Sequence, residues 1–508
     1  MHILLVDTPP LIEIGLRARL ANHHRVSLLN GRTLHADECS AMADVDLVVH
    51  GLPEAGSPLD IIDQATRGTW NLLTTTNARG VVQLSTMRLF ETYNAAWAID
   101  EEWMTRPRDE PGILAAHLAE ITAREICRSR RIDTRVLRLD RVVSAADFRT
   151  GPIDENWLHI DDALTLITGT LSMLADDGEP RWQVVHGVRG RGRYPLGIAA
   201  KDPLRFAPAF PGPAAKTWEE TASGVDDTFD EGSNRPLHDL PPARQVTVFG
   251  AGGPLGAAAA AQLMDMRDIR LRLTDVRSLA SFAAAPPQSE GAPRPATPKT
   301  PHTEQTADVT DLEQVLRASV GADCLVNCAV VRHGVVAAFR VNVLGAYNVM
   351  RAAVATGIGR VVQTGPAQVL LDDPIGYAAD RRVASSTPPR SGANLYFLTK
   401  LLAQEVCRIF AEQHRIACPT LLYTTLLTPE VAQGTVHPFS ISWPDAGRAI
   451  AAAATVSQLP EPAPVVHVRA PSPHGRYRES EIAAVLNWEP QDRLERLWMR
   501  AETVRSDQ

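Results

Sequence analysis

The chain has 508 residues, of which 44% are hydrophobic and 5% aromatic, and it carries a formal net charge of −8. This length predicts two or three domains with buried cores, and the negative charge argues against nucleic acid as a partner. Because we find no apolar stretch of the roughly 20 residues that span a bilayer, no signal peptide and no metal-site cysteine spacing, we expect a cytoplasmic protein without membrane or metal partners.

The first residues predict a strand, a turn and a helix. The apolar run Ile3-Leu4-Leu5-Val6 is typical of a buried strand, and a helix is expected over Leu16–Leu20. Between them lies VDTPPLIEIG, residues 6–15, where an α/β chain usually places glycines that bring backbone N–H groups to a phosphate. This turn contains two prolines and acidic residues instead, so its phosphate chemistry is missing.

Two segments organise the rest of the chain. Residues 201–243 are rich in proline, glycine and acids without a period, and we interpret them as a linker between a domain over 1–200 and a domain over 244–508. Residues 283–307 have a similar proline-rich composition, which predicts a flexible insertion beside the adenosine side of a cofactor.

The second domain begins with a complete glycine-rich turn, VTVFGAGGPLGAAAAAQL. In its pattern, Gly250 permits the sharp turn, Gly253 lets the backbone approach a pyrophosphate, and Gly256 lets the helix pack on the sheet. The next predicted strand ends at Asp275, which suits the ribose hydroxyls of NAD. Arg277 lies close enough to favour the 2′-phosphate of NADP, so NAD is only slightly preferred.

Tyr396 and Lys400 are spaced by four residues, which places both side chains on one helix face. A nearby ammonium is expected to lower the pKa of the phenol from about 10, so that Tyr396 exchanges a proton with a substrate hydroxyl or carbonyl. The chain has four lysines, and only Lys400 falls inside a predicted regular element. This choice of lysine favours a functional role over an exposed lysine beside a core tyrosine.

The sequence also contains an internal repeat. GTWNLL at 68–73 resembles GAYNVM at 345–350, VVQ at 81–83 recurs at 361–363, and EICR at 125–128 recurs as EVCR at 405–408. ADVDLVVHG at 43–51 likewise resembles ADCLVNCA at 322–329, and the offsets run from 277 (345 minus 68) to 280 (361 minus 81). The chain therefore looks like two copies of one α/β unit.

The first copy has lost its chemistry in this alignment. Asp7, Pro10 and Glu13 replace the three glycines, and Ala116 and Glu120 replace Tyr396 and Lys400. A carboxylate repels a pyrophosphate and proline lacks a backbone donor. We interpret the first copy as a pseudo-domain, with a loop rebuilt for another ligand as the alternative.

Each half resembles the extended short-chain dehydrogenase/reductase family, the NAD-dependent epimerase/dehydratase group. In the second half the resemblance rests on the glycine pattern, DVTD at 308–311, NCA at 327–329, Asn342, YFLTK at 396–400 and LNWEP at 486–490. In the first half it rests on WLHIDDAL at 157–164. The resemblance implies two tandem Rossmann-like, doubly wound parallel sheets, a bound NAD or NADP, and a lysine that also binds the nicotinamide ribose.

The candidate cofactor-binding residues are Gly250, Gly253, Pro254, Leu255, Gly256, Asp275, Arg277, Asp308, Val309, Asn327, Cys328, Ala329 and Lys400, and the candidate catalytic residues are Tyr396, Lys400 and Thr364.

One position departs from the family. The resemblance implies a catalytic serine or threonine where this chain has Pro366, and Thr364 lies two residues earlier; the first half has Thr86 at the matching place. Two functions therefore stay open. One is an NAD(P)-dependent oxidoreductase or epimerase for a small biosynthetic substrate, and the other is a non-catalytic dinucleotide-binding sensor or scaffold.

The family typically dimerises through two long helices of each subunit. The corresponding predicted helices are about 62–78 and 112–130 in the first half, and 338–356 and 394–413 in the second. Because an apolar helix face is seldom left exposed, we expect the two halves to form an intramolecular pseudo-dimer, which allows the chain to be a monomer.

Overall fold

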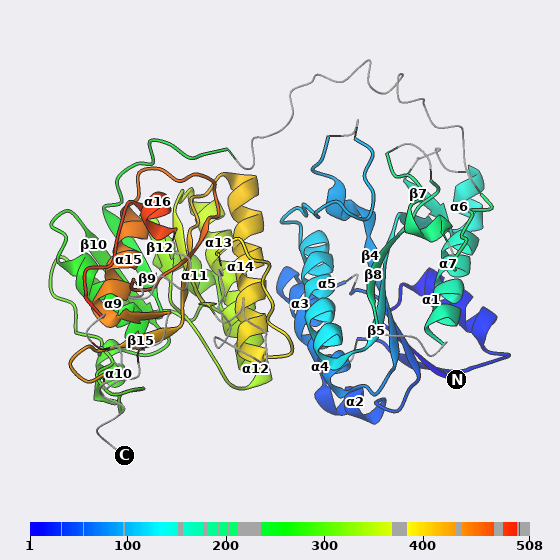
Figure 1. Cartoon of the computed structure of the whole chain (residues 1–508), viewed down its shortest axis with the longest axis horizontal. Coiled ribbons are helices and arrows are strands. Elements are labelled where there is room, and N and C mark those ends of the chain that lie inside the picture. Colours follow the sequence, from blue (N-terminus) through cyan, green and yellow to red (C-terminus); the bar gives the residue numbers. More distant parts are fainter. Residues whose placement is uncertain are drawn as a thin grey trace, which may run out of the picture. The chain divides into compact units, whose positions relative to one another are not determined.

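The fold is taken from a computed structural model that describes residues 1–31, 33–53, 55–94, 97–150, 156–175, 180–190, 193–201, 203–210, 235–367, 384–432, 436, 439–471, 481–494 and 497. The chain divides into two compact units, Met1–Asp230 and Glu231–Gln508 (Figure 1). Of the predicted linker, residues 211–234 lie outside the described part. Its ends pack into the units, since Phe206 joins the core of the first and Leu237 the core of the second.

The first unit is built on a six-stranded parallel sheet with the order β2-β1-β3-β4-β5-β8. The strands are β1 (His2–Val6), β2 (Arg25–Leu29), β3 (Leu47–His50), β4 (Gly80–Thr86), β5 (Asp133–Leu139) and β8 (Trp182–Gly187). Short strands β6 (Arg141–Val143) and β7 (Trp157–His159) pair separately. The central strands are buried along almost their whole length because helices cover both faces of the sheet.

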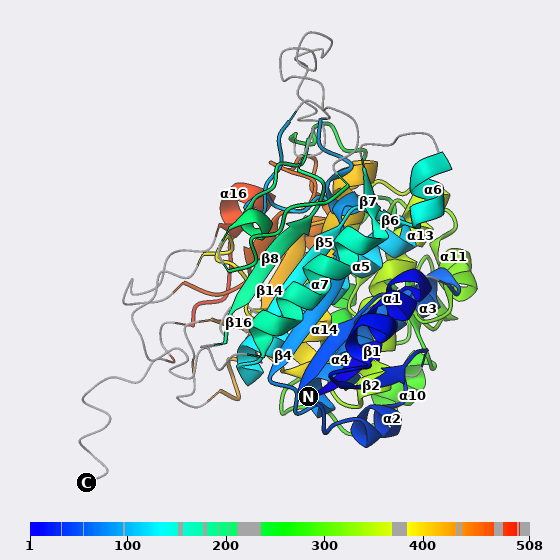
Figure 2. The same ribbon diagram turned by 90° about the vertical axis from the view of Figure 1, so that its right-hand side faces the viewer.

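Helices form two layers around this sheet. Figure 1 shows α3, α4 and α5 on one side and α1 and α7 on the other, and Figure 2 shows α1 and α7 side by side. At their contact, a Cβ on Gly15 would lie 2.3 Å from Leu164, so the glycine allows the two helices to approach. The helices are α1 (Pro10–Leu20), α2 (Ala36–Ala41), α3 (Pro58–Asp63), π-helix η1 (Gln64–Gly68), α4 (Thr69–Thr75), 3-10 helix η2 (Met87–Phe90), α5 (Pro111–Arg130), α6 (Ala145–Thr150), α7 (Ile160–Leu174) and 3-10 helix η3 (Ile198–Ala200).

The second unit has a seven-stranded parallel sheet with the order β11-β10-β9-β12-β13-β14-β17. The strands are β9 (Gln245–Phe249), β10 (Arg270–Asp275), β11 (Thr303–Thr306), β12 (Cys324–Asn327), β13 (Val361–Pro366), β14 (Thr420–Tyr423) and β17 (Val465–His467), with β15 (Thr425–Leu427) and β16 (Ser440–Ser442) paired separately. The strand order reverses between β9 and β12, which is where doubly wound sheets bind ligands. The prediction of a flexible insertion over 283–307 is wrong for residues 303–306, which form the edge strand β11.

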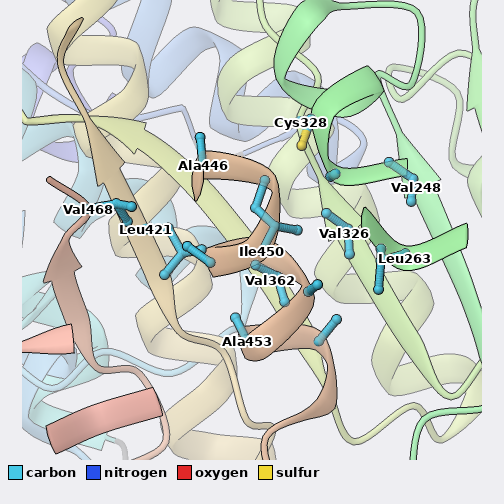
Figure 3. Packing of buried hydrophobic residues seen from close by; sticks show 14 of the residues in the cluster. Val248, Leu263, Val326, Cys328, Val362, Leu421, Ala446, Ile450, Ala453 and Val468 are labelled. Carbon is cyan, nitrogen blue, oxygen red and sulfur yellow. The ribbon is translucent and has the colours of Figure 1, made fainter. Parts of the chain in front are cut away.

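The core of the second unit lies between this sheet and the helices α9 and α15. Figure 3 shows Ile450 and Ala453 of α15 facing Val362, Leu421 and Val326 of the sheet. The helices are α9 (Pro254–Met264), α10 (Leu279–Ala284), α11 (Leu312–Ser319), α12 (Val335–Ala338), π-helix η5 (Phe339–Leu344), α13 (Gly345–Thr356), α14 (Leu395–His414), α15 (Trp443–Thr455) and α16 (Ile482–Leu486).

Two irregular features recur at matching places in the two units. A π-helix, which is a rare structure, precedes α4 in the first unit and α13 in the second, next to Gly68 and Gly345. A buried amide also links the same pair of neighbouring strands, since His50 Nδ1 lies 2.8 Å from Gln83 Oε1 and Asn327 Nδ2 donates to Gln363 Oε1 at 2.9 Å. These features agree with the sequence offsets.

Helix α5 of the first unit is held to β5 by a buried ion pair. Arg138 donates to both carboxylate oxygens of Glu120, at 3.0 and 2.8 Å, and Ser85 Oγ donates to the same carboxylate at 2.6 Å. Burial alone would raise the pKa of the Glu120 carboxyl, but Arg138 and Ser85 hold it below its usual value. The pair thus stabilises the fold above the unfolded pKa of about 4.3, and this contribution is lost as the pH falls.

Removing one partner of this pair leaves the other charge buried and unpaired. We expect Glu120→Ala to lower the free energy of unfolding by about 3–5 kcal/mol, measured by chemical denaturation. The double variant Glu120→Leu/Arg138→Met removes both charges and is expected to lose much less. As an exposed control, Glu110→Ala breaks the pair with Arg88 and should change stability by at most about 1 kcal/mol. Equal losses in the single and double variants would contradict this explanation.

Candidate active site

The candidate site lies at the carboxyl ends of the central strands of the second unit. The glycine-rich turn follows β9, the segment around Arg332 follows β12, Thr364 lies near the end of β13, and Tyr423 ends β14. Helix α14 adds Tyr396 and Lys400. All of these residues line one cavity of about 660 Å³.

The structural constraints at the three glycines of the turn differ. Gly250 has φ of +77°, and a Cβ there would lie 2.6 Å from the Ala329 nitrogen. A Cβ on Gly256 would lie 2.2 Å from the Gly250 carbonyl oxygen. Gly253, the N-cap of α9, has an ordinary φ of −77°, and the nearest atom to its Cβ would be 3.5 Å away. Nothing in the protein requires glycine at 253, so the open space fits a ligand that approaches the backbone and the helix N-terminus.

One end of the cavity carries Asp275. Its carboxylate accepts hydrogen bonds from the backbone N–H groups of Gly252 and Val276, both at 2.8 Å, and burial raises the pKa of this carboxyl. The Arg277 guanidinium lies 4.4 Å from the ring centroid of Phe282. This stacking leaves the edge of the guanidinium available to a ligand. Gln288, from the predicted insertion, also lines the cavity.

The other end carries Tyr396 and Lys400 at the start of α14. Lys400 is 4% exposed, and burial lowers the pKa of its ammonium to about 8. Burial raises the pKa of the Tyr396 phenol, whereas Arg332 lowers it. The prediction that Lys400 lowers this pKa is therefore wrong: the two side chains share a helix face, but desolvation dominates and the cation that acts on the phenol is Arg332.

Sequence reasoning missed Arg332. Its guanidinium lies over the Tyr396 ring, 5.5 Å from the centroid. The side chain is exposed and lines the cavity. The available signal was its position five residues after Asn327, at the carboxyl end of a central strand, where parallel sheets collect ligand-binding groups.

The predicted third catalytic position has no free donor. Thr364 Oγ1 donates to the carbonyl oxygen of Asn327 at 2.9 Å, so its proton is used at the sheet edge. Pro366 lines the cavity two residues later and has no side-chain donor.

The structure gathers the predicted site residues with one exception, Asn327. Its amide lies inside the sheet, where it donates to Gln363 and accepts from the Ala329 N–H at 3.2 Å. The predicted residues that line the cavity are Gly250, Gly253, Pro254, Leu255, Gly256, Asp275, Arg277, Asp308, Val309, Cys328, Ala329, Thr364, Tyr396 and Lys400. Their assigned roles stay predictions.

The corresponding turn of the first unit is closed by its own side chains. Asp7 occupies the place of Gly250 and has the same left-handed backbone, with φ of +45°. Its carboxylate accepts from the Gly31 N–H at 2.6 Å and from Gln64 Nε2 at 2.9 Å. The anion is thus satisfied inside the protein, which leaves the turn unsuited to a second anion.

The alignment of this turn needs a correction of one residue. The first strands start at His2 and Gln245, an offset of 243, but the helices start at Pro10 and Pro254, an offset of 244. Pro9 therefore stands at the N-cap in place of Gly253, and Ile12, not Glu13, in place of Gly256. The first turn is therefore one residue shorter than the second.

The other lost positions of the first unit have structural contacts. Ala116 and Glu120 lie on α5, where Glu120 pairs with Arg138. Thr86 Oγ1 accepts from the Arg88 N–H at 3.2 Å and caps η2.

In the described ranges, no three His, Cys, Asp or Glu side chains are grouped closely enough to hold a metal ion. None of the helices there has the length and apolar character needed to cross a membrane.

The chain is similar to known proteins mainly through its second unit. Residues 246–443 match the model of the NAD dependent epimerase/dehydratase family. No curated protein matches the sequence. Among solved structures, uronate dehydrogenase from Agrobacterium tumefaciens is 22% identical with a TM-score of 0.39, and the alignment covers 52% of this chain and 88% of that one. Glucuronic acid dehydrogenase from Chromohalobacter salexigens is 19% identical with a TM-score of 0.40, with coverage of 52% and 88%. WbmH from Bordetella bronchiseptica, in complex with NAD⁺, is 17% identical with a TM-score of 0.33, with coverage of 42% and 71%.

The glycines provide a matched pair of variants. Gly253→Ala has room for its methyl group, so we expect unchanged thermal stability but at least about tenfold weaker binding of NAD and NADP, because the methyl lies where the backbone should approach the pyrophosphate. Gly256→Ala should also destabilise the unit, by about 1–3 kcal/mol, since its methyl meets the Gly250 carbonyl. Calorimetry should show one nucleotide per wild-type chain. Two equivalent sites, or full affinity in Gly253→Ala, would contradict the assignment.

Proposed function

We propose that the second unit is an NAD(P)-dependent oxidoreductase or epimerase that acts on a hydroxyl or carbonyl group of a small biosynthetic substrate. The observation that carries this proposal is that Tyr396, Lys400 and the glycine-rich turn all line one cavity. The family match over residues 246–443 supports it. We further propose a cytoplasmic location, which agrees with six free and buried cysteines.

The residues present fit a dinucleotide. The N-terminus of α9 and the turn around Gly253 suit the pyrophosphate, while Asp275 and Val309 line the adenosine end. Asp275 favours the ribose hydroxyls of NAD slightly over NADP. When bound, the nicotinamide supplies the hydride chemistry that no side chain can supply.

The protein's own part in the reaction is to bind, orient and move a proton. Tyr396 exchanges a proton with the substrate oxygen, as acid toward a carbonyl or as base toward a hydroxyl. Lys400 contributes a buried cation on the same helix. The resemblance to the family implies that this lysine contacts the nicotinamide ribose. The apolar lining, including Val341 and Leu426, excludes water around these groups.

A specific observation favours the alternative, a non-catalytic dinucleotide-binding sensor or scaffold. Pro366 stands at the position of the family's serine or threonine, and the Thr364 hydroxyl donates to Asn327. A site without that donor would still bind a nucleotide.

We propose that the first unit is a degenerate copy of the second and serves a structural role, as one half of an intramolecular pseudo-dimer. The recurring π-helices and buried amide links support the duplication. Both units keep the helix pairs through which the family dimerises, α4 with α5 and α13 with α14. A pseudo-dimer needs these helices but not the chemistry of the first copy.

Tyr396→Phe tests catalysis. We expect it to reduce turnover by about 10²-fold or more, because the proton donor and acceptor is gone, while NAD(P) affinity measured by calorimetry stays near the wild-type value. Lys400→Ala should weaken both turnover and nucleotide binding. A substrate screen that follows NAD(P)H absorbance supplies the assay. Full turnover by Tyr396→Phe would exclude its assigned role, and binding without any turnover by the wild type would favour the sensor.

The pseudo-dimer predicts the behaviour of the second unit on its own. Residues 235–508 include Leu237, which pairs with Leu459 and belongs to that unit's core, so this fragment keeps its packing. We expect the fragment to self-associate in sedimentation experiments, because its helix pair has lost the covering half, whereas the whole chain sediments as a monomer. A stable, active monomer of the fragment would contradict the pseudo-dimer.

A further inference from the structure

The place where the family has a catalytic serine or threonine offers no free proton donor to the Tyr396 end of the cavity. Pro366 has none, and the Thr364 hydroxyl already donates to Asn327. Lys400 is buried, and the charged or ionisable groups that act on it are Cys328, Cys407 and Arg332. Within the described residues, the cation that acts directly on the Tyr396 phenol is therefore Arg332.

The backbone just before Arg332 is held in place by a buried asparagine. The Asn342 side chain accepts from the Val331 N–H at 3.0 Å and donates to the Val331 carbonyl at 2.8 Å, which fixes the backbone just before Arg332. The same amide donates to Thr399 Oγ1 at 2.9 Å, and Thr399 precedes Lys400 on α14. Asn342 thus connects the segment that carries Arg332 to the helix that carries Tyr396.

Among the ionisable groups near the Tyr396 phenol, Arg332 is the one expected to act on it as a positive charge. The other ionisable side chains at this end of the cavity are Cys328 after β12, Tyr423 on β14 and Lys400 on α14. Burial raises the pKa of Cys328 to about 12 and that of Tyr423 well above its usual value, so both stay neutral near pH 7. The guanidinium of arginine is permanently charged, whereas burial lowers the pKa of the Lys400 ammonium.

We infer that Arg332 is a positioning residue for the reaction: it orients the Tyr396 phenol, favours its deprotonated form, and takes over the electrostatic task that the family assigns to the lysine. This inference rests on the proposed function, since it names a further residue of the same site. It also places a cation beside the phenol in a site whose Pro366 has no side-chain donor, since the Arg332 guanidinium lies 5.5 Å from the centroid of the Tyr396 ring. With Tyr396 as the base, the proton of a substrate hydroxyl passes to the phenolate oxygen beside Arg332.

The test follows the ionisation of Tyr396 itself. The ultraviolet absorbance of tyrosinate is titrated in the whole chain without cofactor or substrate, and subtraction of the Tyr396→Phe titration isolates one of the seven tyrosines. Arg332→Ala is expected to move the midpoint of Tyr396 upward by about one pH unit or more, and Arg332→Lys by less. Arg340→Ala, an exposed arginine on η5 outside the cavity, is the matched control and should leave the midpoint unchanged. Lys400→Met should move it less than Arg332→Ala does.

Two results would overturn the inference: an unchanged midpoint in Arg332→Ala, or a larger rise in Lys400→Met than in Arg332→Ala. Thermal unfolding of each variant checks that the fold is intact. Once a substrate is identified, the rising limb of the kcat/KM pH profile should move with the midpoint in Arg332→Ala. The spectroscopic titration needs no reaction, so a raised midpoint together with a failed substrate screen would keep the electrostatic effect of Arg332 on the phenol and count against the oxidoreductase.

Discussion

The parallel pairing of β9, β12, β13 and β14 is the constraint on which the rest of the second unit depends. Val246, Cys324 and Val361 lie near the starts of three neighbouring strands, so their carboxyl ends reach the same edge of the sheet. The described segments that follow β9 and β12, and the end of β13, contribute residues to one cavity. The glycine turn, the Arg332 segment and Thr364, which are far apart in sequence, meet there because parallel strands end side by side.

Burial has opposite effects on the two kinds of group at this edge. It raises the pKa of Tyr396 and lowers that of Lys400, so each is pushed toward its neutral form. A site that needs a phenolate beside a cation must counter this tendency. The guanidinium of Arg332 provides a cation over the Tyr396 ring, and Arg277, Asp275 and Asp308 also line the cavity.

The first unit has the same layered fold without a glycine-rich turn and without a tyrosine–lysine pair on α5. Its turn keeps the left-handed residue after β1, but an aspartate side chain fills the turn and bonds to Gly31 and Gln64. Glu120 lies on α5, and its buried pair with Arg138 ties this helix to the sheet. Charges that would face a ligand in the second unit are satisfied within the protein in the first.

The sequence by itself determined the parallel α/β architecture, the repeat, the glycine-rich turn and the Tyr396–Lys400 spacing, because each of these depends on local periodicity or short spacing. Only the tertiary structure decided the contacts among distant segments: Arg332 over Tyr396, the Thr364 hydroxyl on Asn327, Asn327 inside the sheet, and β11 within the proline-rich insertion. It also reversed the expected shift of the Tyr396 pKa. The physical reason is that desolvation and side-chain direction depend on what surrounds a residue in space, and residue spacing along one helix does not contain that information.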